Sequence, residues 1–232
     1  MNHNIEHLHF EECESTQIIL KTELEKRDDS PNLLITSRKQ TKGRGRSGNT
    51  WESVENSIAM SFILSPNSEL TLTSLEIGAL ICLFFKSENL LLKWPNDILN
   101  SNRMKCAGIL CQTHRDKILV GLGLNYGPSK TLEKSEQFKF GRSHITNEEI
   151  ESRRVKSIAL NLYSFLINNR LTKEETIKTW NTYCVHMDQS VEIRDSNNIQ
   201  AGMFKGIGKN GEALLENKGL ITKVYTGSLF LN

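Results

Sequence analysis

The apolar residues of this 232-residue chain come in short runs, and this limits the folds that it can adopt. The longest runs, such as residues 58–64 (IAMSFIL) and 80–85 (LICLFF), have six or seven residues. A transmembrane helix needs about 20, so the sequence excludes a membrane-spanning protein. A run of this length at 58–64, bounded by polar residues, predicts a buried strand. We therefore expect short elements that share a water-excluded core.

Local patterns assign most of the chain to short strands and amphipathic helices. Further β-prone runs predict strands at residues 8–10, 33–37, 90–93, 106–112 and 118–124, with a hairpin turn at 100–103. Helical periodicity predicts helices from Ser15 to about residue 27, at 72–86, at 147–169 with an acidic start at 146–150, and at 173–184. This mixture predicts an α+β fold with a mixed β-sheet packed against helices.

The pattern changes near Met187, where the helical periodicity stops. Short strand candidates follow at residues 191–194, 203–207, 213–216 and 222–225, separated by Asn and Gly turns. The last 46 residues are enough only for a small β-barrel module. We therefore expect a larger domain over residues 1–186 and a small β domain over residues 187–232, packed closely because no long linker separates them.

Charge and cysteine usage narrow the class of protein. Lys and Arg (29) nearly balance Asp and Glu (27), so the formal net charge is only +2 and no overall field draws the chain to nucleic acid or an anionic membrane. The N-terminus lacks a cationic segment followed by an apolar one, which predicts a cytoplasmic protein. Five widely spread cysteines fit reduced thiols. His7 and His9 alternate with apolar residues as on a half-buried strand, so they do not indicate a metal site.

Residues 38–49 form the most distinctive polar segment, a predicted loop with three glycines and no apolar side chain. Within it, Gly43-Arg44-Gly45-Arg46 allows the backbone to fold closely around a ligand while guanidinium and amide groups point at an anion. The pattern predicts a loop that binds a phosphate or a carboxylate. Two alternatives stay open at this point: an RGG-like nucleic-acid segment, although such units usually repeat, and a merely solvated loop.

A second polar cluster, Lys93-Trp94-Pro95-Asn96-Asp97, directly follows the apolar run at 90–92. A strand that ends in a cation, a proline-fixed turn, an amide and a carboxylate predicts phosphate binding and a ligand for Mg²⁺. The alternative is an ordinary Pro-Asn-Asp turn.

Two further features lie on the predicted strands that follow. Lys105 precedes a small, apolar strand, where its side chain either extends to water or binds an anionic ligand. Gly121 and Gly123, followed by Asn125, permit close approach of a ligand to the backbone. They lack the third glycine and the following helix of a dinucleotide-binding fingerprint, so we do not expect that cofactor.

Taken in order, five motifs resemble those of the biotin protein ligase family. They are Glu14-Ser15-Thr16-Gln17, Gly43-Arg44-Gly45-Arg46-Ser47-Gly48 with Trp51, Lys93-Trp94-Pro95-Asn96-Asp97, Lys105-x-Ala107-Gly108-Ile109-Leu110, and Gly121-x-Gly123-x-Asn125. Residues 206–215 resemble the small C-terminal SH3-like domain of those ligases. The resemblance implies a class II synthetase-like catalytic domain. Because the first motif begins so near Met1, we expect a short form without the DNA-binding domain of some family members, which does not bind DNA.

The resemblance implies a two-step reaction. Biotin and MgATP would form biotinyl-5′-AMP and pyrophosphate, and a specific lysine of a biotin carboxyl carrier domain would then be acylated. The resemblance also allows a homodimer formed through sheet edges. The nearest alternative is a lipoate protein ligase, which shares the fold and the adenylate chemistry. An alternative of another class is a non-catalytic nucleic-acid-binding or adapter protein, which the small net charge disfavours.

The family motifs also imply the site residues. Ser15, Thr16 and Gln40 would hydrogen-bond the ureido group of biotin. The rest of the biotin site would be Gly43, Arg44, Gly45, Arg46, Lys105, Gly108, Gly121 and Gly123. Lys105, Arg46 and Asp97 would be catalytic, with Asp97 as the Mg²⁺ ligand or the acceptor of the incoming amine's proton. The nucleotide would contact Lys93, Trp94, Asn96, Asn125 and Phe140, the last within a predicted second lid at residues 128–142.

Overall fold

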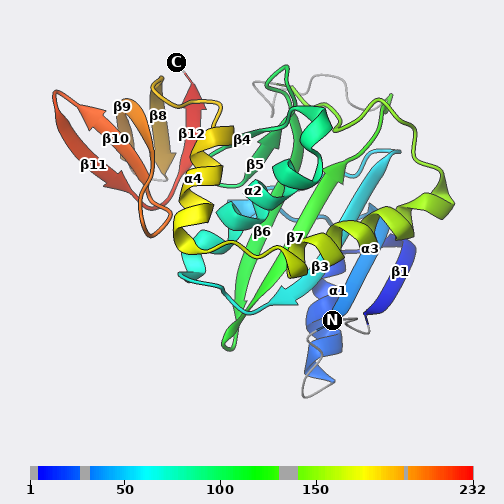
Figure 1. Cartoon of the computed structure of the whole chain (residues 1–232). Coiled ribbons are helices and arrows are strands. Elements are labelled where there is room, and N and C mark those ends of the chain that lie inside the picture. The colour runs from blue at the N-terminus through cyan, green and yellow to red at the C-terminus, as the bar shows by residue number, and fades with distance from the viewer. Residues whose placement is uncertain (1–4, 27–31, 131–140, 196–197, 232) are drawn as a thin grey trace.

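The computed structural model describes residues 5–26, 32–130, 141–195 and 198–231. It contains two separate β-sheets, with helices against the larger one (Figure 1). The larger sheet has seven strands, β1 (Glu6–Cys13), β2 (Leu33–Gln40), β3 (Ser57–Leu64), β4 (Leu91–Lys93), β5 (Asp97–Leu99), β6 (Lys105–His114) and β7 (Lys117–Asn125). The four α-helices are α1 (Thr16–Glu25), α2 (Thr73–Phe84), α3 (Ser152–Asn168) and α4 (Lys173–Tyr183). The predicted α+β class is confirmed.

The larger sheet is mixed and runs in the order β1-β2-β3-β7-β6-β5-β4. Only the β1–β2 pair is parallel, because α1 connects these two strands; every other neighbouring pair is antiparallel. Alternation along the strands sends side chains to two apolar layers. Leu33 and Ile35 pack with α1 on one face, whereas Leu34 joins the larger core that includes α2 and α3 on the other.

The predicted strands are present, but two details of the sheet differ from expectation. Strand β2 continues through Gln40, so the polar loop starts at residue 41, three residues later than predicted, and Lys39 and Gln40 pair with β1 instead. The sequence also missed β5, which lies between β4 and β6 in the sheet. Residues 97–99 are too short to show a β pattern by themselves, and pairing with both neighbours stabilises them.

The predicted start of the third helix is wrong. Residues 146–150 have the acidic composition of a helix start, yet α3 begins at Ser152. The preceding chain is instead held in an extended path, because the amides of Ile145 and Thr146 donate to the carbonyl of Tyr126 at 3.2 and 2.9 Å. Ile145 and Ile150 are buried in the main core, and this packing outweighs the local helix preference. Helix α4 begins as expected, with a capping box between Thr172 and Glu175.

The C-terminal residues form a five-stranded antiparallel sheet in the order β11-β10-β9-β8-β12. Its strands are β8 (Ser190–Asp195), β9 (Asn198–Ile207), β10 (Ala213–Asn217), β11 (Leu220–Val224) and β12 (Ser228–Leu231). Four of them match the predicted small β module, and the sequence missed β12. In Figure 1 this sheet stands beside α4 at one end of the molecule. None of the described helices is long and apolar enough to cross a membrane.

Three short 3₁₀ turns complete the described chain: η1 (Arg46–Gly48), η2 (Leu70–Leu72) and η3 (Lys86–Glu88). The first lies inside the Gly/Arg loop, and the second leads directly into α2.

Candidate active site

A cavity of about 480 Å³ opens over the larger sheet on the face that carries α1. The floor of this cavity consists of residues with small side chains. Ser61 of β3 pairs with Gly121 of β7, and Gly123 of β7 pairs with Gly108 of β6, so small residues lie side by side across three strands. On the same face, Leu119 two residues before Gly121 is large and fills the core under α1. The change from large to small residues leaves a hollow of the size that small-molecule ligands occupy.

The Gly/Arg loop folds over this hollow as a tight hairpin. Arg44 pairs with Thr50 in an antiparallel bridge, and the Trp51 amide donates to the Gly43 carbonyl at 3.0 Å. Gly43 is required there, because a Cβ would lie 2.3 Å from the Trp51 carbonyl oxygen. The hairpin places the Trp51 indole against Gly123, where a Cβ would lie 2.3 Å from the ring. Trp51 therefore forms part of the wall above the glycine floor.

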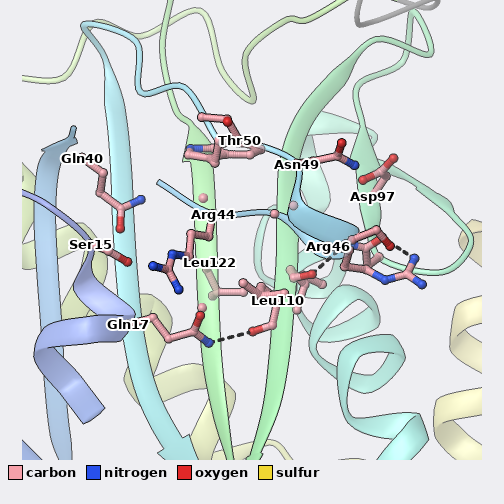
Figure 2. Close-up of a pocket in the computed structure, with 18 of the residues that line it drawn as sticks. Ser15, Gln17, Gln40, Arg44, Arg46, Asn49, Thr50, Asp97, Leu110 and Leu122 are labelled. Atoms are coloured by element: carbon pink, nitrogen blue, oxygen red, sulfur yellow. Dashed lines mark hydrogen bonds between the residues drawn. The ribbon is translucent and has the colours of Figure 1, made fainter. Parts of the chain in front are cut away.

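One end of the cavity carries hydrogen-bonding side chains, and the Arg44 guanidinium extends toward it (Figure 2). The backbone amide and the hydroxyl of Thr16 both donate to Gln40 Oε1, at 2.8 and 3.1 Å. The hydroxyls of Thr16 and Ser61 share a further hydrogen bond of 2.8 Å. These bonds fix the amide of Gln40 so that its Nε2 stays available. Ser15 is 2 % exposed at the start of α1, and its hydroxyl makes no capping bond there, so it too is available to a ligand.

The opposite end carries a compact charge cluster. Asp97 Oδ1 lies 2.5 Å from Lys105 Nζ, and Asp97 Oδ2 lies 3.5 Å from Lys93 Nζ. Burial by itself would raise the pKa of the Asp97 carboxyl, but the two ammonium groups outweigh it and hold the pKa below its ordinary value. Burial lowers the pKa of Lys93, and the Asp97 carboxylate opposes that shift. The carboxylate thus holds two cations near each other, and of the two Lys105 lines the cavity.

Arg46 adds a third cation and links the loop to the rest of the site. Its Nη1 donates to Asn96 Oδ1 and to the Gly227 carbonyl, both at 3.4 Å. Asn96 is itself fixed, because its Nδ2 donates to the Ile109 carbonyl at 2.7 Å. Burial lowers the pKa of the Arg46 guanidinium, which stays protonated at neutral pH because its ordinary pKa is so high. Figure 2 shows Arg46 and Asp97 together at the end opposite Ser15 and Gln40.

The residues present do not build a site for a metal ion held by the protein. Among the described residues that line the cavity, Asp97 is the only carboxylate, and both of its oxygens already face ammonium groups. The described part of the chain contains no group of three or more His, Cys, Asp or Glu side chains that would hold a metal. Mg²⁺ commonly binds one or two carboxylates together with substrate phosphates, and the described lining supplies a single carboxylate, Asp97, so such an ion would depend on phosphate ligands.

Comparison with known proteins identifies the family. Residues 10–127 match the model of the biotin/lipoate A/B protein ligase family. The chain belongs to this family. It is 28% identical to the bifunctional ligase/repressor BirA of Bacillus subtilis over 242 aligned positions, which cover 97% of this chain and 74% of that protein.

Solved structures share the fold of this family member. The biotin protein ligase of Aquifex aeolicus, in complex with biotin and ATP, matches with a TM-score of 0.78 and 24% identity over 97% of this chain and 99% of that chain. The biotin acetyl coenzyme A carboxylase synthetase of Helicobacter pylori, with bound biotinylated ATP, matches with a TM-score of 0.71 and 19% identity over 95% of this chain and 100% of that chain. The fold therefore extends over nearly the whole chain.

Most of the ligase-family residues expected from the sequence meet in the cavity. Those that line it are Ser15, Thr16, Gln40, Arg44, Gly45, Arg46, Asn96, Asp97, Lys105, Gly108, Gly121 and Gly123. Residues from six separate segments are thus brought together by the pairing of β2, β3, β7, β6 and β5.

Four expected residues do not line this cavity. Gly43 closes the loop hairpin, and Lys93 lies behind Asp97. Trp94 is 1 % exposed and donates from Nε1 to the Gly211 carbonyl, so it links the larger sheet to the turn between β9 and β10. Asn125 is buried, and its Nδ2 donates to the Ser143 carbonyl at 3.1 Å. Phe140 lies outside the described residues.

Several cavity residues were not predicted. Gln17 of α1 donates from Nε2 to the carbonyls of Leu110 and Leu119, at 3.4 and 3.5 Å, and faces Gly121. Its place directly after Ser15-Thr16 was a signal that could have found it. Ser61 and Ser228 also line the cavity. Nothing local marks them, because strand register alone places Ser61 on the floor, and a turn of the C-terminal sheet brings Ser228 to the loop.

Proposed function

We propose that this protein is an ATP-dependent biotin protein ligase. In the first step biotin and ATP react to form biotinyl-5′-AMP, and pyrophosphate is released. In the second step the biotinyl group is transferred to a lysine of a biotin carboxyl carrier domain. The observation that carries this proposal is one cavity with the hydrogen-bonding side chains of Ser15 and Gln40 at one end and the Asp97, Lys105 and Arg46 cluster at the other. Biotin has the matching division, with a ureido ring at one end and a carboxylate at the other.

The polar end around Ser15 and Gln40 favours biotin over lipoate. A ureido group has N–H donors and a carbonyl acceptor, and these fit the Ser15 hydroxyl and the Gln40 amide. The dithiolane ring of lipoate has no strong hydrogen-bonding group, so it would leave these buried polar groups without partners. Each such loss costs about 1–3 kcal/mol. The polar end therefore supports biotin as the carboxylic acid.

The cationic end suits the adenylation step. That step brings a carboxylate up to a triphosphate, and the two anions repel each other. Lys105 would face the biotin carboxylate and the α-phosphate, while Arg46 would face the phosphates from the loop side. The bond from the carboxylate oxygen to the α-phosphorus forms as the bond from that phosphorus to the bridging oxygen of pyrophosphate breaks. Any Mg²⁺ in this step arrives with the nucleotide phosphates.

The role of Asp97 is better understood as positioning than as proton transfer. Its depressed pKa makes it a weak base for the ammonium group of an acceptor lysine. Its ion pairs instead keep Lys105 and Lys93 next to each other against their mutual repulsion. We propose that residues 1–186 carry adenylation and that residues 187–232 form a second domain, which contributes Gly227 and Ser228 to the site.

The test is pyrophosphate exchange into ATP by the purified protein with biotin, with lipoate, or with neither acid. We expect exchange that requires biotin. Exchange that requires lipoate instead would move the protein to the other branch of its family. Exchange without any acid, or no exchange by folded protein, would refute adenylation of a carboxylic acid.

A further inference from the structure

An ion pair joins the Gly/Arg hairpin to a segment that lies 90 residues later in the chain. Arg142 Nη1 donates to Glu52 Oε2 at 2.8 Å. Glu52 directly follows Trp51 and belongs to the second arm of the hairpin, residues 50–52, whereas residues 41–44 form the first arm. The Glu52 side chain is 57% exposed and the Arg142 side chain is 10% exposed. The arginine is therefore the buried, fixed member of the pair.

The backbone around Arg142 is attached to the larger sheet at Lys105. The two residues form a parallel bridge, in which the Lys105 amide donates to the Gly141 carbonyl at 3.2 Å and the Ser143 amide donates to the Lys105 carbonyl at 2.9 Å. Asn125 Nδ2 holds the Ser143 carbonyl in turn, at 3.1 Å. The guanidinium thus projects from a firm base beside the cationic end of the candidate active site.

The hairpin is not packed onto the sheet along its whole length. A space of about 750 Å³ is lined by hairpin residues 41–50 and by residues 110–112 of β6. The first arm is attached where it starts, because the amides of Thr41 and Lys42 donate, both at 2.9 Å, to carbonyls at and just after the end of β1. On the second arm, the ion pair with Arg142 supplies such an attachment.

The position of Trp51 depends on where the second arm lies. The indole packs against Gly108 and Gly123 on the cavity floor, and its ring centroid is 5.8 Å from Lys105 Nζ. Because Glu52 is the next residue, a second arm that leaves the sheet takes the indole with it. The cavity would then open above the two glycines, and water would reach the bound acid and its reactive adenylate.

We propose that Glu52 and Arg142 are positioning residues for the ligase reaction. Their ion pair holds the second arm on the sheet and thereby keeps Trp51 over the bound carboxylic acid. Neither residue is among the described residues that line the cavity, so the pair acts through Trp51 and not on the substrate itself. The inference rests on the proposed function for the identity of the acid, whereas the link from the pair to Trp51 can be measured without any ligand.

The test uses Glu52→Gln, Arg142→Met and the double variant, each of which breaks the pair. The matched control is Lys42→Met, which removes another ion pair of the same hairpin, 2.7 Å from Lys42 Nζ to Glu14 Oε1. That pair lies on the first arm, where backbone hydrogen bonds already attach the chain. Biotin-dependent pyrophosphate exchange gives kcat and the KM for biotin of each protein.

We expect Glu52→Gln and Arg142→Met each to raise the KM for biotin by about 5-fold, the effect of losing one ion pair that is exposed on one side. The kcat should stay within about 2-fold of native, because neither substitution removes a cation that faces the phosphates. The double variant should match the single variants, since all three break the same bond. The KM and kcat of Lys42→Met should both stay within about 2-fold of native.

Tryptophan emission of the ligand-free proteins gives a readout that does not need activity. Trp94 and Trp180 are only 1 % and 2 % exposed, so a shift to longer wavelength in the pair variants, absent from Lys42→Met, would report release of Trp51.

An unchanged KM for biotin or an unchanged emission in Glu52→Gln would overturn the inference. A double variant with the summed effects of both single variants would do so too, because it would show that Arg142 acts apart from Glu52. If the native protein shows no biotin-dependent exchange, the proposed function fails, and the emission shift still decides whether the pair holds Trp51.

Discussion

The wall that Trp51 forms over Gly123 leads to a sharp prediction about two neighbouring glycines. A Cβ at Gly123 would lie 2.3 Å from Trp51 Cε2 and 2.7 Å from Cζ2 and Nε1. A Cβ at Gly121, on the same face of the same strand, would lie 3.4 Å from Gln17 Nε2. Carbon atoms in ordinary contact are about 3.5–4.0 Å apart. Gly123→Ala must therefore displace the indole by roughly 1 Å, whereas Gly121→Ala needs almost no movement.

Displacement of the Trp51 indole should weaken ligand binding more than it lowers the free energy of unfolding. The Trp51 backbone is held by Gly43, so the ring has to swing, and its contact with Lys105 Nζ, 5.8 Å from the ring centroid, changes with it. Overpacking of this kind costs about 1–3 kcal/mol. We expect Gly123→Ala to raise the KM for biotin in pyrophosphate exchange by about 10- to 100-fold. Gly121→Ala, the matched control, should stay within about 3-fold of native.

Tryptophan fluorescence gives an independent readout. The chain has three tryptophans, and Trp94 and Trp180 are only 1 % and 2 % exposed. A shift of the emission to longer wavelength in Gly123→Ala would therefore report Trp51 turning toward solvent. The reasoning is wrong if Gly121→Ala impairs biotin binding as much as Gly123→Ala does, or if Gly123→Ala leaves both the KM and the emission as they are in the native protein.

Three other predictions follow from buried charges and polar groups. Lys105→Met should slow biotin-dependent exchange by about 100-fold or more, because it removes a cation from the developing charge; a loss below 10-fold would refute that role. Glu76→Gln should lower the free energy of unfolding in urea by about 1.5–3 kcal/mol, because Glu76 accepts two bonds from Arg170 at 2.7 and 2.9 Å in a partly buried pair; an unchanged urea midpoint would contradict this. His186 is fully buried, neither ring nitrogen has a partner among the described residues, and burial lowers its pKa to about 3. Because the unfolded chain takes up this proton below about pH 6.5 and the folded one does not, native stability falls as the pH drops from there toward 3. The unfolding free energy of His186→Phe, relative to that of the native protein, should therefore rise by about 3 kcal/mol as the pH falls from about 7.5 to 4. Urea unfolding at both pH values measures this difference, and a difference that does not change with pH would contradict the account.

The fold could be predicted from the sequence where the signal is local. The run at 58–64 became β3 within one residue, because seven consecutive buried positions leave few alternatives. Strand β5 was missed because three residues carry no periodicity and depend on β4 and β6. The start of α3 was misplaced because the burial of Ile150 depends on packing against distant strands. Local sequence patterns do not reveal elements that depend on contacts with residues far apart in the chain.

The candidate site could also be predicted only where its residues stand out in the local sequence. The Gly/Arg loop, the Lys93–Asp97 turn and Lys105 stand out by composition, and the structure brings Arg46, Asp97 and Lys105 to one end of a cavity. The sequence could not show that the Trp94 indole N–H donates to the Gly211 carbonyl, in the turn between β9 and β10, because the two residues lie far apart in the chain. The position of Trp51 over Gly123 follows from the register that pairs Gly123 with Gly108, which no local pattern contains.

The central claim is that this chain attaches biotin, and not lipoate, to a carrier domain. The most direct measurement is the intact mass of a purified biotin carboxyl carrier domain after incubation with the protein, MgATP, and equal amounts of biotin and lipoate. The account predicts that the carrier gains the mass of one biotinyl group and that the gain is lost in Lys105→Met. A carrier that gains a lipoyl group, or that stays unmodified while the protein is folded and both acids are present, would contradict it.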